Sequence, residues 1–381
     1  MLRAVRDIDN SATTDHSRPG GETDTSHAPM PQEARKRGIR VWGLTPEYDY
    51  TRCLYSALRS QGVDVRDGEW SFRRLMPVAR RGDIVCLHWP SFLYHVPKSP
   101  ARTWFMLLRF VVLMALFRAR GLRYFWVAHN LYPHDGGRGL LAHRIARRAV
   151  VTFASWIGVH SDAAGRRVQE EFGVRPRRVV RLEHGNWSGL YPNQISREEA
   201  RRRLEVAPDA FVFLFFGLCK EYKNLTELLR SHLEVADGSL LWIVGKFQSQ
   251  TYYSEVASLA AGHPSVWIRN GFVEKEDLQL FFNACDVAVL PYKEILTSGT
   301  VYTALDFGRP VVAPRLSDLE EVVTNDCGVL YDPDRPSALA QALRAARERR
   351  FDAAQIVQRA GQFSWERSAR HFLEAVCRDA T

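Results

Sequence analysis

Several features that would indicate a particular class of protein are missing from this sequence of 381 residues. Its six cysteines stand far apart and form no Cys-x-x-Cys pair, which argues against a zinc or dithiol site and favours free thiols in a reducing compartment. A membrane-spanning helix needs about 20 apolar residues. The apolar run WFMLLRFVVLMALF, residues 104–117, is shorter than this and contains Arg109. No short-period repeat of the solenoid kind is present.

Residues 1–37 also lack the apolar core of a secretory signal, and their Ser, Thr, Asp, Gly and Pro content predicts a disordered leader. The length of the remainder suits two domains. A net charge of +9 is compatible with phosphate-bearing substrates, an anionic membrane or nucleic acid, so charge alone does not choose between these partners.

From residue 39 onward, short apolar runs alternate with helical stretches, in two successive series. This alternation predicts parallel sheets covered by helices on both faces, and therefore an α/β fold. We expect Rossmann-like domains over residues 38–190 and 211–362, joined by a polar linker over 191–210. An amphipathic helix over 363–381 could pack on either domain.

In the first series, four apolar runs are each followed at once by a histidine: His88, His129, His160 and His184. Since ligands bind beyond the carboxyl ends of parallel strands, four histidines at equivalent positions favour a site over four separate structural roles. His134 and Asp135 follow one of these strands closely.

In the second series, the residues after the strands suit a phosphate-bearing ligand. Gly217 permits close backbone approach, and Lys220 and Lys223 add two cations. Across the same edge, Ser298-Gly299-Thr300 opens a helix, and the free N–H groups at a helix start attract anions. Together these segments predict a diphosphate clamp. No Asp-x-Asp pair follows a strand, so neither a metal ion nor another cofactor is expected.

The segments FFGLCKEYKN, WIVGK, NGFVEKEDLQLFFNACDVAVLPY and SGTVYTALDFGRPVVAP resemble the donor half of glycosyltransferases with the GT-B fold, two Rossmann-like domains facing each other across a cleft. The segments LHWPSFLYHVP, WVAHNLYPHD and HGNW look more specifically like bacterial exopolysaccharide β-1,4-mannosyltransferases. That resemblance implies transfer of mannose from GDP-mannose to a polyprenyl-diphosphate-linked oligosaccharide, as in xanthan assembly.

The resemblance also assigns residues to a donor site and an acceptor site. The implied donor-binding residues are Gly217, Lys220, Lys223, Gly245, Phe272, Val273, Ser298, Gly299 and Thr300. Those implied for the acceptor are Trp89, His134 and His184. We call Ser298-Gly299-Thr300 the donor turn. The sequence departs from the retaining members of family 4 at this turn: those enzymes carry two glutamates around it, and Ile295 and Thr303 occupy the two positions here.

The missing glutamates favour an inverting mechanism, which needs one general base in the acceptor half. Asp135 is the first candidate, with His129 and His88 as alternatives. For Asp135, capping of the following helix is an equally good explanation.

Basic residues flank the run at 104–117, namely Lys98, Arg102, Arg118, Arg120 and Arg123. They favour a helix lying on anionic lipid, hence peripheral attachment to the cytoplasmic face of the inner membrane; a core helix explains the pattern equally well.

Two alternatives stay open: a retaining GT-B enzyme using another nucleotide sugar such as a UDP-hexose, and a non-catalytic binder of nucleotide sugar or nucleic acid. The basic residues are spread over many helices, which weakens the nucleic-acid reading.

Overall fold

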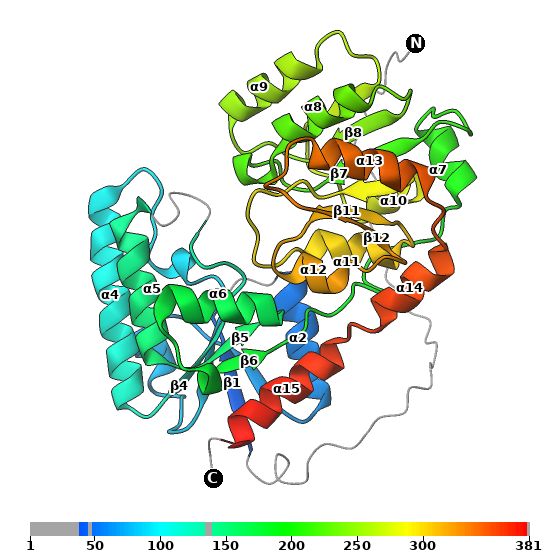
Figure 1. The fold of residues 1–381 in the computed structure, drawn as a ribbon. Helices are drawn as coiled ribbons and strands as arrows, with labels where there is room; N and C mark the ends of the chain where they lie inside the picture. The colour runs from blue at the N-terminus through cyan, green and yellow to red at the C-terminus, as the bar shows by residue number, and fades with distance from the viewer. Residues whose placement is uncertain (1–37, 45–47, 134–138, 379–381) are drawn as a thin grey trace, which may run out of the picture.

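The computed structural model describes residues 38–44, 48–133 and 139–378. Within these ranges the chain forms two separate six-stranded parallel sheets, one in each half of the sequence, with helices packed around them (Figure 1). The predicted α/β class with two Rossmann-like halves is confirmed. The leader at 1–37 lies outside the described residues.

The first sheet has the strand order β2-β1-β3-β4-β5-β6. Its strands are β1 (Arg40–Gly43), β2 (Asp64–Asp67), β3 (Ile84–Leu87), β4 (Arg123–Val127), β5 (Ala154–Val159) and β6 (Val179–Arg181). The helices of this half are α2 (Asp49–Ser60), α3 (Phe72–Leu75), α4 (Pro100–Ala119), α5 (Leu141–Phe153) and α6 (Asp162–Phe172), with short 3-10 turns η1 (Pro90–Leu93) and η3 (Pro176–Arg178). The central strand β3 is buried at every position, as helices on both faces of a parallel sheet require.

The second sheet has the strand order β12-β11-β10-β7-β8-β9. Its strands are β7 (Val212–Phe216), β8 (Leu240–Val244), β9 (Val266–Arg269), β10 (Val287–Val289), β11 (Val311–Pro314) and β12 (Gly328–Tyr331). The helices that follow the linker in this half are η4 (Glu221–Lys223), α8 (Leu225–Val235), α9 (Gln250–Ala260), α10 (Leu278–Ala284), α11 (Gly299–Asp306), α12 (Asp318–Val322), α13 (Ala338–Glu348) and α14 (Ala353–Gly361).

Each sheet contains a point where the direction of winding reverses. The first sheet reverses between β1 and β3, and the second between β7 and β10. Loops that leave such neighbouring strands diverge and open a crevice, which is where open α/β sheets bind ligands. The two loops that lead from β7 and β10 are those in which the sequence predicts the diphosphate clamp.

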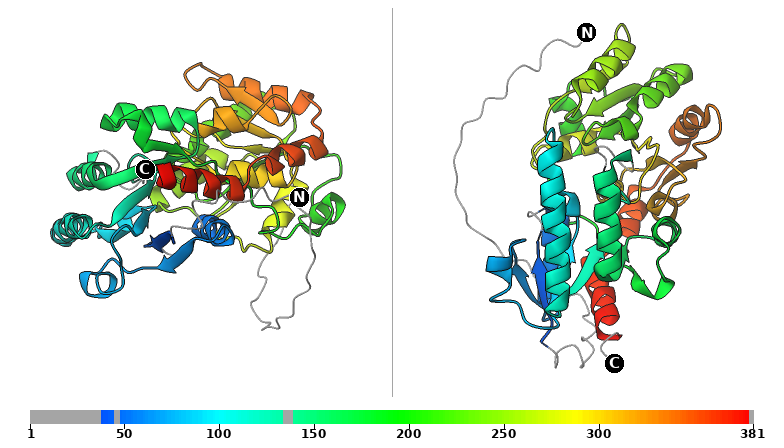
Figure 2. Two further views of the ribbon diagram at one scale, coloured as in Figure 1. Left: turned by 90° about the horizontal axis from the view of Figure 1, so that it is seen from below. Right: turned by 90° about the vertical axis from the view of Figure 1, so that its left-hand side faces the viewer.

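The final helix, α15 (Trp365–Arg378), crosses back to the first half, where it packs against α2 and β6 (Figures 1 and 2). Phe372 of this helix stacks on Phe125 of β4 with ring centroids 4.3 Å apart. Trp365 also lies so close to Gly185 that a Cβ there would come within 2.4 Å of the indole ring. The chain therefore ties its two halves together twice, once through the linker and once through α14 and α15.

The segment expected to be a polar linker contains a packed helix, α7 (Arg197–Arg203), which lies against α10. Two arginines of this helix bind the carboxylate of Asp286, Arg197 at 2.5 Å and Arg201 at 2.8 Å. Arg201 is buried, so this pairing satisfies a charge that would otherwise be costly. The linker is thus fixed on the second half.

Candidate active site

The two parts of the predicted diphosphate clamp are connected by Tyr292. The Nζ of Lys223 lies 3.6 Å from the centroid of the Tyr292 ring, and the Tyr292 hydroxyl is 3.2 Å from the Oγ of Ser298. Lys223 is only 9% exposed, so it is a positioned cation rather than a flexible one. Two neighbouring tyrosines, Tyr292 and Tyr222, raise its pKa against the opposing effect of burial, which keeps it charged at neutral pH.

Gly217 and Gly245 both adopt positive φ angles, of +125° and +150°. A Cβ on Gly245 would lie 1.8 Å from the carbonyl oxygen of Gly217, so Gly245 is required for the close approach of two backbone segments. A Cβ on Gly217 would instead point toward the Oγ1 of Thr300, 3.8 Å away. Only Gly217 therefore faces the start of α11.

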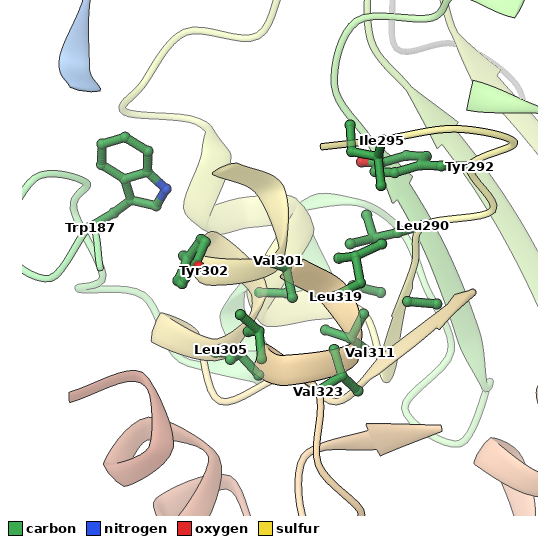
Figure 3. Packing of buried hydrophobic residues seen from close by; sticks show 14 of the residues in the cluster. Trp187, Leu290, Tyr292, Ile295, Val301, Tyr302, Leu305, Val311, Leu319 and Val323 are labelled. Atoms are coloured by element: carbon green, nitrogen blue, oxygen red, sulfur yellow. The ribbon is translucent and has the colours of Figure 1, made fainter. Parts of the chain in front are cut away.

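Helix α11 is held by a segment of the first half. The indole N–H of Trp187 donates to the carbonyl of Gly299 at 2.9 Å, and the backbone N–H of Trp187 donates to Asp306 at 2.6 Å. A Cβ on Gly299 would lie 3.3 Å from the Trp187 ring, and Figure 3 shows Trp187 on a loop outside the helix that carries Val301 and Tyr302. The two bonds reach the first and last residues of α11, so the orientation of the predicted phosphate-binding helix depends on the segment between β6 and the linker.

A second support of the donor turn comes from the start of α12, at its first residue Asp318 and the preceding Ser317. Asp318 Oδ2 accepts hydrogen bonds from the Thr297 hydroxyl at 2.7 Å and from the Ser298 backbone N–H at 3.1 Å. The hydroxyl of Ser317 donates to the carbonyl of Leu296 at 2.7 Å. Asp318 is fully buried, and burial raises the pKa of its carboxyl to about 7. The neighbouring residue Ser317 has a φ of +49°, a conformation that costs free energy in a residue with a side chain.

The other predicted donor residues lie at the same edge of the second sheet. Lys220 immediately precedes the turn η4, and Thr300 lies in the first turn of α11. Phe272 and Val273 belong to the loop between β9 and α10; Val273 packs on the core, whereas Phe272 is 72% exposed. This edge thus offers cations, backbone N–H groups and one exposed aromatic ring.

In the first half, three of the four predicted histidines form a continuous hydrogen-bonded chain. His88 Nδ1 lies 3.1 Å from His129 Nε2, and His129 Nδ1 lies 3.3 Å from His160 Nε2. His160 Nδ1 is 2.7 Å from the carbonyl oxygen of Leu182, which can only accept. Each ring must therefore donate from Nδ1 and accept at Nε2, and the Tyr55 hydroxyl, 3.0 Å from His88 Nε2, supplies the first proton.

These histidines are neutral because they are buried. Burial lowers the pKa of His88 to about 3 and of His160 to about 4, and it holds the pKa of His129 well below its usual value. In this arrangement neither ring nitrogen of His129 has a lone pair left for an acceptor hydroxyl, and both nitrogens of His88 are also bonded. The geometry weighs against these two histidines as the general base.

The remaining predicted acceptor residues border this chain. Trp89 stacks on His129 with ring centroids 4.2 Å apart and nearly parallel planes. His184 stacks on Tyr302 of α11 at 4.4 Å, so it joins the two halves. His134 and Asp135 lie outside the described residues, and Asp135 stays a prediction made from the sequence.

Sequence reasoning missed Trp187, Asp306, Asp318 and Tyr292. Trp187 and Tyr292 lie inside the segments HGNW and PYKE, which the sequence pattern already places after strands β6 and β10. No comparable signal marks Asp318, because a serine followed by an acidic residue before a helix ordinarily indicates a simple helix cap.

Comparison with known proteins covers both halves. Residues 210–348 match the domain described as Glycosyl transferases group 1. The chain is 28% identical over 308 residues to the GDP-mannose:glycolipid 4-β-D-mannosyltransferase of Xanthomonas campestris pv. campestris, spanning 78% of this chain and 82% of that enzyme. It is 30% identical over 248 residues to the D-inositol 3-phosphate glycosyltransferase of Geodermatophilus obscurus, spanning 61% of this chain and 55% of that enzyme.

Solved structures share the fold at low sequence identity. The sucrose-phosphate synthase of Thermosynechococcus elongatus superposes with a TM-score of 0.63 at 16% identity, covering 87% of this chain and 96% of that one. The Anabaena protein HepE in complex with UDP gives 0.63 at 15% identity, covering 88% and 98%. These structures and the two parallel sheets show the GT-B fold, and the matched domain and the two relatives show that the chain is a glycosyltransferase.

Proposed function

We propose that this glycosyltransferase moves mannose from GDP-mannose onto a lipid-linked oligosaccharide, inverting the anomeric centre, in exopolysaccharide assembly. The observation that carries the proposal is the similarity to the Xanthomonas mannosyltransferase, which extends over 82% of that enzyme and so includes acceptor and donor halves alike. The donor site described above supplies the chemistry that such a reaction requires.

The donor diphosphate would lie at the winding reversal between β7 and β10. The backbone N–H groups at the start of α11 carry the positive end of the helix dipole, and Lys220 and Lys223 lie across the same edge. Their charge stabilises the nucleoside diphosphate as it leaves, and fixed donors of this kind act without reorganisation. In this proposal the clamp replaces a metal ion.

The residues that replace the two glutamates of retaining enzymes in this chain favour an inverting mechanism. Ile295 is a buried apolar residue, and Thr303 donates its hydroxyl to the carbonyl of Gly299 at 3.3 Å. Neither can act as a carboxylate. A base in the acceptor half must then take the proton of the attacking hydroxyl, and Asp135 is the proposed residue. An Asp135→Asn variant should lose mannose transfer and still bind GDP.

The membrane part of the proposal rests on one face of α4. Trp104, Phe105, Leu108, Val112 and Leu116 recur about every fourth residue and are between 44% and 67% exposed. We call these five residues the apolar ridge. Regular spacing of this kind places them along one side of the helix.

The opposite side of α4 packs into the first half and includes Leu107, Phe110, Met114 and Phe117. By length and composition alone, α4 could also cross a membrane; a third of its most apolar stretch is buried in the protein. Exposed Arg102, Arg118 and Arg120 lie at its ends, whereas Arg123 lies over the Trp156 ring. We propose that the helix rests on the membrane surface, with apolar contact and arginine charge acting together.

Calorimetric titration of GDP, UDP, GDP-mannose and UDP-glucose, without metal, tests the donor. We expect selective binding of the two guanine nucleotides, at least tenfold weakened in a Lys223→Ala variant. Selective UDP binding would preserve the fold and refute the donor. Binding of a donor that is never turned over would indicate the non-catalytic alternative. If NMR shows that the new mannosidic bond in the product is axial, the enzyme is retaining.

Flotation with vesicles of phosphatidylglycerol and phosphatidylethanolamine tests the membrane contact. A Phe105→Glu/Leu108→Glu variant should lose vesicle binding. Val357→Glu on α14 is the control, since Val357 is an exposed apolar residue in the second half, at 46% exposure. The proposed contact between the apolar ridge and the membrane would be contradicted if the control lost vesicle binding, or if the double variant still bound vesicles.

A further inference from the structure

A guanidinium is buried in the acceptor half and has no charged partner in the part of the chain that the structure describes. Arg147 lies on α5 and is 2% exposed. Its Nη2 makes one long hydrogen bond, 3.5 Å, to the side-chain oxygen of Asn130. Its Nε and Nη1 have no partner, and its Cζ lies 4.7 Å over the ring of Trp126. Burial lowers the pKa of Arg147 to about 10, so the group is still charged at neutral pH.

Two tyrosines, Tyr94 and Tyr132, are close enough to Arg147 to affect its electrostatics. Tyr94 and His143 bond each other at 2.9 Å, and the ring of His95 lies 4.8 Å from that of His143. The buried Nδ1 of His95 is unpaired. The nearby hydroxyl of Tyr132 donates to Glu171 at 2.9 Å. Among the described residues, no carboxylate forms an ion pair with Arg147.

Such an arrangement is costly in the protein alone. Each unpaired buried donor destabilises the folded protein, and more so when the group is charged. The cation–π contact with Trp126 offsets only part of this cost. The Nη1 and Nη2 end of the planar guanidinium is a fork that fits two oxygens of one carboxylate or phosphate group, so such a group would satisfy the unpaired Nη1. Nε points to a different side of the guanidinium.

The location of this cluster points to the acceptor. Asn130 and Tyr132 follow β4, and Tyr94 and His95 follow η1 beyond β3, so all four lie at the carboxyl edge of the first sheet. Helices α4 and α5 pack against each other, which places Arg147 beside the helix that carries the apolar ridge.

We infer that Arg147, together with Asn130, forms a binding site for an anionic oxygen group, a phosphate or a carboxylate. That this group belongs to the acceptor rests on the proposed function; the anion site itself does not. The guanidinium of Arg147 and the side-chain amide of Asn130 together define the orientation of the bound anionic group, so no other charged residue is needed to recognise it.

The test measures thermal and denaturant stability while sodium phosphate or sodium acetate is titrated at constant ionic strength. Wild-type protein should be stabilised saturably, since an anion that binds only the folded state shifts unfolding. An Arg147→Met variant should lose the response by at least tenfold in apparent affinity. Arg144→Met is the matched control, because Arg144 is exposed on the same helix and should keep the response.

Stability without anions provides an independent arm. Since no described carboxylate pairs with Arg147, Arg147→Met should be at least as stable as the wild type in anion-free buffer. Marked destabilisation there, or absence of a saturable wild-type response, would overturn the inference. So would a response lost in Lys220→Ala and kept in Arg147→Met, which would place the anion at the donor turn. A preference for phosphate or for acetate identifies the source, and either preference supports the site. Failure of GDP binding would instead concern the proposed function.

Discussion

Replacing Asp318 with asparagine should make the protein more stable at alkaline pH. The wild-type carboxyl is fully buried and has no cationic partner among the described residues; one oxygen accepts two hydrogen bonds and the other accepts none. Burial raises its pKa from 3.8 to about 7, a rise to which the neighbouring Glu321 adds, while the bonds from Thr297 and Ser298 partly oppose it. Asparagine resembles the protonated acid and can keep both bonds.

The sign and size of the effect follow from proton linkage. Between pH 3.8 and about 7 the unfolded carboxyl is ionised while the folded one stays protonated, so the free energy of unfolding falls as pH rises. Above about pH 7 both states are ionised and the loss is complete. With about 1.4 kcal/mol for each pKa unit, the advantage of the variant should grow by about 2.5 kcal/mol from pH 5 to pH 8.

Urea denaturation of both proteins at pH 5, 6, 7 and 8 measures this difference. Other titrating groups, Asp306 among them, occur in both proteins and cancel. Asp326→Asn serves as the control, since Asp326 is exposed in the loop before β12 and should shift stability by less than about 0.5 kcal/mol at every pH. A difference between Asp318→Asn and wild type that stays constant from pH 5 to pH 8 would refute the reasoning.

Three further outcomes are expected. Trp187→Phe should lower the free energy of unfolding by about 1 kcal/mol, since it removes the bond to Gly299, while Trp104→Phe on the exposed face of α4 should not; urea denaturation compares them. Gly185→Ala should lower the melting temperature by several degrees, because its Cβ would meet the Trp365 ring at 2.4 Å, and an unchanged melting temperature would contradict that contact. EDTA should leave the rate of sugar transfer unchanged. A loss of transfer in EDTA that added Mg²⁺ reverses would refute metal independence.

The class of fold could be predicted from sequence because local patterns define it. Apolar runs such as IVCL and VFLFF became β3 and β7, and the residues after them lie at the edges where ligands bind. That rule placed four histidines together and placed Lys223 near Ser298, before any contact was known.

Contacts between distant segments could not be predicted in this way. The sequence left open which half α15 packs on, and Trp365 decides this by fitting over Gly185. The burial of Lys223 against Tyr292 depends on two loops whose contacting residues are 69 positions apart in the sequence (292 − 223). Asp318 and Arg147 likewise become unusual only after burial removes them from water, which no spacing pattern reveals.

The most direct test of the central claim is to follow GDP formation and mannose incorporation together, using the purified chain, GDP-mannose and a bacterial lipid extract that supplies the acceptor. We predict that each GDP released is matched by one mannose in the lipid fraction, and that UDP-glucose gives neither product. Folded protein that binds GDP but releases none from GDP-mannose, or that transfers sugar only from a UDP donor, would contradict the proposed mannosyltransferase.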